Sequence, residues 1–382
     1  MIDFSLTAGD RRLIEVTRLE NEAMRKHARY YDQHEDEIEP ASFPESSELP
    51  DKMELMREIE DQTSGLVIAE SLMDLEYADP RLRRTEHGLG DMIVGYAGTP
   101  EQLERFGHLV LAIALTEPGA GSDPRAITGS ARYDEATGEW VLNGEKIYCS
   151  KFGQADGAVV LLKGESEGGH RPFLAFIVEK GTPGLVQLGQ VKKMGIRNWD
   201  TEDFVLQDCR VPAINKVDAD FGKTMVVFNG TRPKVAAMGL SIARTLMDFT
   251  RDKLKEAGVN VHYAAGRAKR SQLEDRLLRL EALHEATKLS ILNCKWREQN
   301  EGTNTGATKV DAAIAKAMGG GAARRITQEC MEMLGPLGLS EEFLAEKWYR
   351  DARIFDIFEG AGEVNRLIVA RWLLDYSSKE LN

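Results

Sequence analysis

Apolar residues follow two different spacings along the chain, and their order predicts three regions. Residues 6–36 and 50–77 repeat apolar positions at helical spacing among many charges. Between about 109 and 212, apolar residues instead form short runs typical of strands, such as 158–162 and 173–178. Helical spacing then returns, which predicts helices over 234–255, 272–299, 310–333 and 362–374.

This order is typical of an α+β protein in which a β domain is inserted between two helical domains. A chain of 382 residues is long enough for two or three domains. We therefore predict an N-terminal helical domain over 1–108, a middle β domain over 109–215 and a C-terminal helical domain over 216–382.

An Asn-Gly dipeptide interrupts the strand-like run of residues 140–148. Asn143 and Gly144 lie between two short apolar runs. Asn-Gly is the residue pair that a type I′ turn favours, because both central positions need positive φ. The sequence therefore predicts a β-hairpin whose turn is Asn143-Gly144.

Composition excludes several classes of protein. No apolar run approaches the roughly 18–20 residues that span a bilayer, and the N-terminus lacks a basic segment followed by an apolar one. The four cysteines, at 149, 209, 294 and 330, form no CxxC pair, so we predict neither a disulfide framework nor a zinc site. These features predict a cytoplasmic protein without a membrane anchor.

The formal net charge of −13 makes nucleic acid an unsuitable partner, because duplex binding needs a concentrated basic face. It still allows an anionic cofactor, which a few local cations and backbone N–H groups can hold. The seven histidines show no HExxH or comparable spacing, and no GxSxG element is present. We therefore predict no metal site and no serine hydrolase.

Two blocks of sequence carry the candidate chemistry. The first, TEPGAGS at 116–122, follows a strand-like run, and its glycines would let backbone N–H groups approach a pyrophosphate. An ordinary strand-to-loop turn without a ligand is the alternative. Because Asp123-Pro124 follows in place of a helix, the loop is not a Rossmann motif. The second block, RDARIFDIFEGAGE at 350–363, contains Glu359, which by itself could equally cap a helix beginning near Gly362.

Together and in this order, the two blocks resemble the acyl-CoA dehydrogenase family, and the likeness covers most of residues 86–374. The resemblance implies an N-terminal helical domain, a middle β-barrel-like domain and a C-terminal four-helix bundle. It also implies FAD as cofactor and α,β-dehydrogenation of an acyl-CoA thioester. Glu359 would remove the α proton, in a water-poor pocket that raises its basicity, while flavin N5 takes the β hydride.

The resemblance assigns further residues one by one. Some relatives carry the base just before the arginine that matches Arg232; here that residue is Thr231, so Glu359 is the single candidate base. Substrate would contact Ser122, Arg232 and Gly360. The implied cofactor-binding residues are Leu115, Thr116, Gly121, Ser122, Tyr148, Cys149, Ser150, Gly335, Gly362 and Glu363.

Partners are implied in the same way, together with two alternatives. Members of the family form homotetramers or dimers through their C-terminal helices and pass electrons to an electron-transfer flavoprotein. The cross-subunit part of the FAD site departs from the family pattern at 258–270 and at Pro336, which lacks an N–H. The chain could therefore be one subunit of a heteromer with a paralogue, its FAD site partly degraded. An oxygen-using oxidase or monooxygenase on the same fold is the other alternative.

Overall fold

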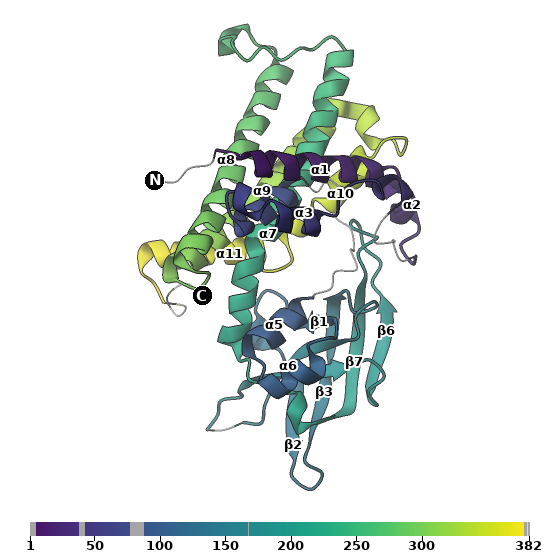
Figure 1. Ribbon diagram of the computed structural model, residues 1–382, viewed down its shortest axis with the longest axis vertical. Coiled ribbons are helices and arrows are strands. Elements are labelled where there is room, and N and C mark those ends of the chain that lie inside the picture. Colours follow the sequence, from purple (N-terminus) through teal and green to yellow (C-terminus); the bar gives the residue numbers. More distant parts are fainter. Residues whose placement is uncertain (1–4, 38–42, 77–87, 167, 378–379, 381–382) are drawn as a thin grey trace.

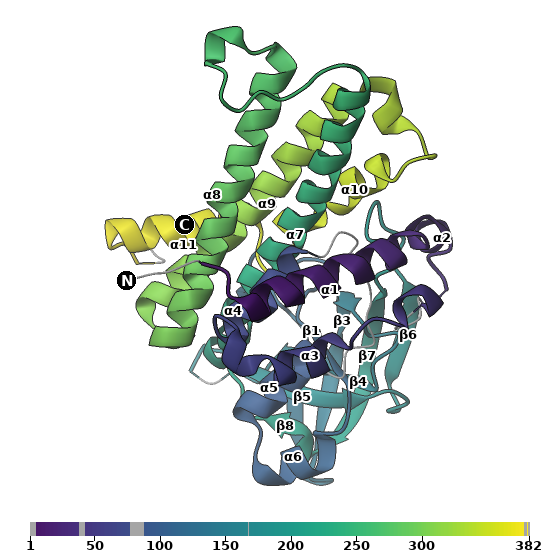
Figure 2. The ribbon, with the colours of Figure 1, turned by 45° about the horizontal axis from the view of Figure 1, so that its top comes forward.

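The computed structural model describes residues 5–37, 43–76, 88–166, 168–377 and 380. Helices come first along the chain, strands follow and long helices end it, which confirms the predicted α+β order. The sheet lies at one end of the molecule, and the long helices α7 Phe221–Glu256, α8 Gln272–Glu301 and α9 Gly306–Leu334 extend to the other end, with α7 beginning beside the sheet (Figure 1). Helix α1 Ala8–Arg25 crosses these helices between the two ends. Seen from a second direction, α4 lies next to α1, with α5 and α6 beside the sheet (Figure 2).

The N-terminal region contains more helices than its apolar pattern predicts. The single helix predicted over 6–36 is wrong, because the chain turns at His27, whose ring stacks on Phe43 at 4.0 Å. The helix predicted over 50–77 is also broken, between residues 58 and 66, where Gly65 has φ +117, and its predicted end at Tyr77 lies outside the described residues. The observed helices are α1 Ala8–Arg25, α2 Ala28–Gln33, α3 Lys52–Glu58, α4 Leu66–Leu75, α5 Leu89–Ala97 and α6 Pro100–Phe106.

Among the described residues, the strands form one eight-stranded sheet with the order β6-β7-β3-β2-β4-β5-β8, and β1 pairs in parallel with β4. Phe176 on β5 and Phe204 on β7 share one apolar core although three strands separate them, so the sheet folds back on itself as the barrel-like prediction requires. Val159 and Leu161 on β4 face the opposite way, toward α5 and α6. The strands are β1 Leu111–Ala114, β2 Ser130–Asp134, β3 Glu139–Ser150, β4 Gly157–Lys163, β5 Phe173–Glu179, β6 Leu185–Gln190, β7 Thr201–Pro212 and β8 Lys216–Val217.

The hairpin predicted at Asn143-Gly144 is wrong. Both residues lie inside β3, which runs unbroken through 139–150, and the register with β7 shifts there as in a β-bulge. Asn143 donates to the Asp208 carboxylate at 3.0 Å and accepts from the Asp208 backbone N–H at 2.8 Å. A Cβ on Gly144 would approach the Cα of Gly129 to 2.9 Å. Close strand packing therefore explains this Asn-Gly pair.

Helices α7 Phe221–Glu256, α8 Gln272–Glu301 and α9 Gly306–Leu334 form the body of the C-terminal region. Helix α7 begins 13 residues before the predicted start at 234, with Asp220 as its N-cap. Pro233 lies inside α7, so the carbonyl of Asn229 lacks its usual helical donor. The sequence pattern placed the start too late because a proline normally interrupts a helix.

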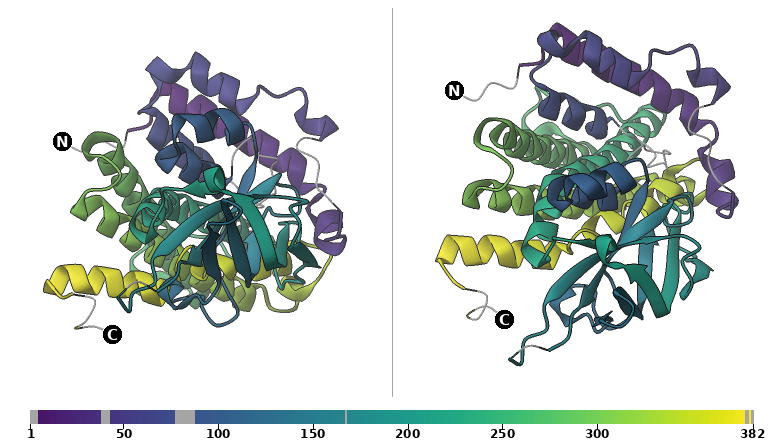
Figure 3. Two further views of the ribbon diagram at one scale, coloured as in Figure 1. Left: turned by 90° about the horizontal axis from the view of Figure 1, so that it is seen from below. Right: turned by 60° about the horizontal axis from the view of Figure 1, so that its bottom comes forward.

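Two shorter helices complete the C-terminal region. Helix α10 Ala345–Asp351 packs on α7 and α9, and α11 Gly362–Leu374 packs on α9 as the fourth helix of the predicted bundle. Helix α11, drawn in yellow, projects from the body of the molecule (Figure 3). None of the described helices is long and apolar enough to cross a bilayer.

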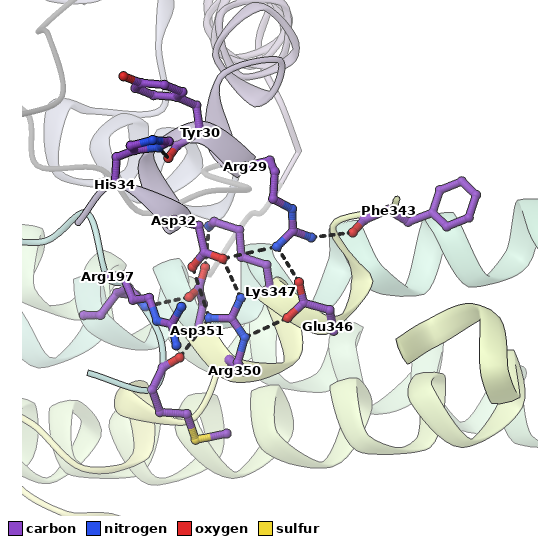
Figure 4. Close-up of polar contacts among 12 residues, drawn as sticks. Arg29, Tyr30, Asp32, His34, Arg197, Phe343, Glu346, Lys347, Arg350 and Asp351 are labelled. Atoms are coloured by element: carbon purple, nitrogen blue, oxygen red, sulfur yellow. Dashed lines mark hydrogen bonds and ion pairs between the residues drawn. The ribbon is translucent and has the colours of Figure 1, made fainter. Parts of the chain in front are cut away.

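A buried network of charges joins the three regions (Figure 4). Arg350 on α10 donates to the Asp32 carboxylate on α2 at 2.6 Å and to the Met194 carbonyl, between β6 and β7, at 2.8 Å. Beside it, Asp351 accepts from the Ile196 backbone N–H at 2.5 Å. Helix α10, which leads directly to the segment carrying Glu359, is thereby fixed to both other regions.

Candidate active site

Glu359 and Gly360 form a left-handed turn just before α11. Their φ values are +55 and +98, and non-glycine residues adopt such angles rarely. A Cβ on Gly360 would approach the side-chain nitrogen of Asn365 to 3.1 Å, so glycine suits both the angle and the space. The N-cap of α11 is Ala361, and the partly buried Glu359 points elsewhere. Glu359 is therefore not the helix-capping residue that its sequence position also allowed.

The Glu359 carboxylate faces the middle of α7. Thr231 donates its hydroxyl proton to Oε2 of Glu359 at 2.7 Å, and Arg232 donates to the Glu359 backbone carbonyl at 3.3 Å. Arg232 is itself buried and also donates to Asn229 at 2.7 Å. The structure thus brings together Glu359, Gly360, Thr231 and Arg232, which the sequence separates by more than 120 residues.

Burial raises the pKa of Glu359 above its ordinary value, although the Thr231 hydrogen bond and the charges of Lys316, Arg232 and Lys234 offset part of this effect. A raised pKa makes the carboxylate a stronger base, which proton removal from carbon requires. The Thr231 hydroxyl, placed to donate to Glu359 at 2.7 Å, favours the ionised carboxylate and so lowers the pKa of Glu359.

We expect Thr231→Val to raise the pKa of Glu359, because it removes a hydrogen bond that favours the charged carboxylate. A base must be ionised to act, so the rising limb of a kcat/KM–pH profile should move to higher pH, by about half to one unit. Above that limb the rate should change little. A profile that keeps its position would show that this hydrogen bond does not control the ionisation of Glu359.

The second candidate block, TEPGAGS at 116–122, is anchored by a buried ion pair. The Lys146 ammonium, 0% exposed, lies 2.7 Å from the Glu117 carboxylate and donates to the Leu115 carbonyl at 3.2 Å. Glu117 also accepts from the backbone N–H groups of Thr128 and Gly129 at 2.6 and 3.1 Å. Burial raises the pKa of Glu117, but the contacts with Lys146 and Thr128 lower it by more, so the pKa lies below its ordinary value.

Strand β3 lies against this loop and presents the other predicted cofactor residues. The Ile147 N–H donates to the Thr116 carbonyl at 3.0 Å. Tyr148 is 60% exposed and Ser150 is exposed on the same strand. The Cys149 side chain, in contrast, is buried and donates to the Ile113 carbonyl, so only its backbone remains available to a ligand.

The loop at 116–122 leaves space for a ligand. Leu115 and Thr116 are half-buried, and Ser122 is exposed. Cβ atoms added to Gly119 or Gly121 would meet no atom within 4 Å, so free space lies in front of both. Backbone N–H groups at such a turn suit a pyrophosphate, and the exposed Tyr148 ring suits a flat heterocycle. These residues fit FAD.

Lys234 connects the two halves of the site. It lies three residues after Thr231, which places both on one face of α7. Burial and, to a smaller extent, the charge of Lys234 lower the pKa of Lys151 to about 8. The same Lys234 charge acts on Glu359. Because Lys151 directly follows Ser150, the end of β3 and the base face a common region.

The remaining predicted cofactor residues have other neighbours. Gly362 is buried against Asp356, and the exposed Glu363 pairs with Arg366 at 3.4 Å. Gly335, with φ +57, ends α9 about 28 Å along the helix from Lys316, at 1.5 Å per residue. One chain therefore does not bring Gly335 to the Glu359 site.

Sequence analysis did not identify the buried charged residues that hold the segments of the site in place. Lys146, Glu117 and Lys316 are buried, whereas isolated lysines and glutamates normally lie on the surface. One weak signal was present, since Lys316 interrupts an otherwise small and apolar run, AAIAKAMGGGAA at 312–323. Within the described residues, no group of His, Cys, Asp or Glu is arranged to hold a metal ion.

Comparison with known proteins gives consistent results. Two family models match: "Acyl-CoA dehydrogenase, middle domain" over residues 112–209 and "Acyl-CoA dehydrogenase, C-terminal domain" over 221–374. The chain is 32% identical to the acryloyl-CoA reductase (NADH) of Anaerotignum propionicum, over 72% of this chain and 70% of that protein. It is also 32% identical to the short-chain specific acyl-CoA dehydrogenase of Megasphaera elsdenii, over 72% and 73%. The structure of butyryl-CoA dehydrogenase from Megasphaera elsdenii matches with a TM-score of 0.77 at 27% identity, over 98% of this chain and 100% of that one.

Proposed function

The chain belongs to the acyl-CoA dehydrogenase family, and on that premise we propose that Glu359 removes the α proton of an acyl-CoA thioester during α,β-dehydrogenation. One observation carries the proposal. The partly buried carboxylate of Glu359 has a raised pKa and accepts a hydrogen bond from Thr231 at 2.7 Å. It faces the same region as the end of β3. Abstraction of a weakly acidic C–H proton needs a base of this kind.

Other groups of the chain stabilise the charge that develops on the thioester. Within the described residues, the backbone N–H of Glu359 has no hydrogen-bond acceptor, so it is free to donate to the thioester carbonyl oxygen. Such donation strengthens as negative charge moves onto that oxygen. Arg232 holds the Glu359 carbonyl at 3.3 Å and thus orients the peptide that makes this contact.

The cofactor is FAD, and bound FAD supplies the two-electron oxidant that accepts the β hydride. Leu115, Thr116, Gly121 and Ser122 would hold it from the loop, and Tyr148 and Ser150 from β3. The open space at Gly121 and the exposed face of Tyr148 support this assignment. Gly335, Gly362 and Glu363 remain proposed FAD contacts, with Gly335 reaching the FAD of a second copy of the chain.

A groove across α8, α9 and α11 supports self-association. Leu283, Ile314, Met318, Val369 and Leu373 line it, and the Leu373 side chain is 75% exposed. Charged residues such as Arg324, Arg325 and Glu332 also line it, and exposed apolar residues bordered by charged ones are typical of a protein interface. We therefore propose a dimer or tetramer of identical chains, in which the groove is covered by another copy. Electron-transfer flavoprotein is the proposed electron acceptor.

Three cations support a CoA thioester as the substrate. The Arg125 guanidinium lies 5.0 Å from the ring centre of Phe221, and the Lys163 ammonium lies 4.8 Å from that of Phe173. Burial and the charges of Arg171 and Arg125 lower the pKa of Lys163, and the charge of Asp123 opposes them. None of the three cations forms an ion pair with any described residue. Their positive charge suits the phosphates of CoA.

Arg125→Ala combined with Arg171→Ala should raise KM for an acyl-CoA by about tenfold, which corresponds to about 1.4 kcal/mol of lost phosphate binding. The kcat should stay unchanged, because neither residue lies near Glu359. The matched control is the same acyl group on pantetheine, which lacks the nucleotide phosphates; its KM should not change. Equal increases with both substrates would contradict a phosphate-binding role.

The experiment that tests the function is an anaerobic titration of the FAD-loaded protein with a panel of acyl-CoAs that starts from short chains. Bleaching of the oxidised flavin band by one thioester would support dehydrogenation and identify the substrate class. If the protein stays oxidised with every thioester, the proposal is wrong. Re-oxidation of the reduced protein by air, faster than by electron-transfer flavoprotein, would instead favour the oxygen-using alternative.

A further inference from the structure

Helix α9 carries a fully buried lysine beside the candidate base. The Lys316 side chain is 0% exposed. Its ammonium donates to the Phe355 carbonyl at 2.7 Å and to the Gly360 carbonyl at 3.2 Å. It forms no ion pair with any described residue, although a buried ammonium normally has a carboxylate partner. A charge in this position is costly, so its contacts with the 355–360 segment need an explanation.

We propose that Lys316 is the positioning residue of Glu359, holding the chain on both sides of it through the Phe355 and Gly360 carbonyls. This inference rests on the proposed role of Glu359 as the base. Phe355 precedes Glu359 by four residues and Gly360 follows it directly, so one ammonium group spans the segment. Lys316 thus acts through Glu359 and does not itself touch the thioester.

The turn at Glu359 needs such a restraint. Two consecutive residues with φ of +55 and +98 cost conformational energy and persist only where surrounding contacts enforce them. Besides Lys316, the buried Asn365 on α11 donates to the Gly360 carbonyl at 2.8 Å. Two buried donors from two helices therefore converge on one carbonyl oxygen and fix the direction of the preceding side chain.

The charge of Lys316 also acts on the ionisation of Glu359. Around the pair, α7 contributes Arg232 and Lys234, and the 354–361 segment contributes Asp356 and Glu359 themselves. Burial lowers the pKa of Lys316 to about 8, an effect that Glu359 and Asp356 oppose and Arg232 adds to. Below that pH, Lys316 is charged and favours the ionised carboxylate. Loss of the charge should therefore raise the pKa of Glu359.

The test measures proton removal separately from oxidation. A CoA thioester whose β carbon bears no hydrogen cannot be dehydrogenated, but its α protons can still exchange with D2O on the FAD-loaded enzyme. Exchange rates against pH are compared for wild type, Glu359→Gln, Lys316→Met and Lys316→Arg. The matched control is Lys347→Met, which removes another buried lysine of the helical domain, 2.6 Å from Asp351.

We expect Lys316→Met to slow exchange at least about tenfold and to move the acid limb of its pH profile upward by about one unit, since it removes both a restraint and a nearby positive charge. Lys316→Arg keeps the charge and should leave that limb in place. If Lys316→Met does not fold, Lys316→Gln replaces it, with the same expected displacement.

The outcomes separate this inference from the function on which it rests. If the wild type exchanges no α proton, Glu359 is not the base. If the wild type exchanges and Glu359→Gln does not, the base is established. An unmoved pH profile in the uncharged Lys316 variant then overturns the role of Lys316, and so does an equal displacement in Lys347→Met.

Discussion

Glutamine in place of Glu359 is expected to reduce α-proton removal by about 1,000-fold or more, in a protein that still folds and binds FAD. The amide keeps the size of the side chain and can still contact the Thr231 hydroxyl, which lies 2.7 Å from Oε2. It cannot accept a proton from carbon. The measurement is flavin reduction after rapid anaerobic mixing with the best acyl-CoA from the titration, together with FAD content and thermal unfolding.

Glu341→Gln is the matched control, because Glu341 is exposed in the segment before α10 and lies outside the proposed site. Its reduction rate should equal that of the wild type. Rapid flavin reduction by Glu359→Gln would exclude Glu359 as the base. Thr231, at the alternative base position that the family resemblance implies, has no carboxylate that could replace Glu359.

The second large effect is expected from Lys146→Met, which should destabilise the protein by about 3–5 kcal/mol and abolish tight FAD binding. The substitution leaves the Glu117 carboxylate buried without its cation, 2.7 Å from the position of the lost ammonium. It also removes the donor to the Leu115 carbonyl. Because both contacts fix the 116–122 loop, the loop should lose the shape that accommodates the cofactor. The measurements are chemical denaturation and the FAD dissociation constant.

Two comparisons make this result specific. Lys146→Met combined with Glu117→Gln should recover part of the lost stability, because no unpaired charge remains buried. Lys216→Met, which changes an exposed lysine of the same sheet, should alter stability by less than about 0.5 kcal/mol. An unchanged FAD dissociation constant in Lys146→Met would show that the ion pair does not shape the cofactor loop.

Periodicity predicted the order of the regions but not every break within them. Helix α11 begins and ends where its apolar pattern does, at 362 and 374. The breaks at His27 and Gly65 depend on contacts with residues distant in sequence, such as Phe43. Asn143-Gly144 has the composition of a turn, yet the approach of Gly129 accounts for its glycine. Tertiary packing decided each of these positions.

The candidate site was predictable where it depends on motifs. Glu359 and Thr116 stand in recognisable blocks, and the geometry of Glu359 with Arg232 agrees with that interpretation. The supporting residues were not predictable, because Lys146 contacts the Glu117 carboxylate and the Leu115 carbonyl, and Lys316 contacts the Phe355 carbonyl, all of them distant in the sequence. No local pattern distinguishes a lysine that will be buried from one that will be solvated.

The buried charges around Arg350 have a consequence for folding cooperativity. Asp32 and Arg350 are 318 residues apart, and the Met194 carbonyl that Arg350 also binds belongs to the sheet region. Local opening of any one region would expose a charge whose partners remain buried, at a cost of several kcal/mol. Partial unfolding is therefore unfavourable, and the N-terminal helices, the sheet and the helical bundle should melt as one unit.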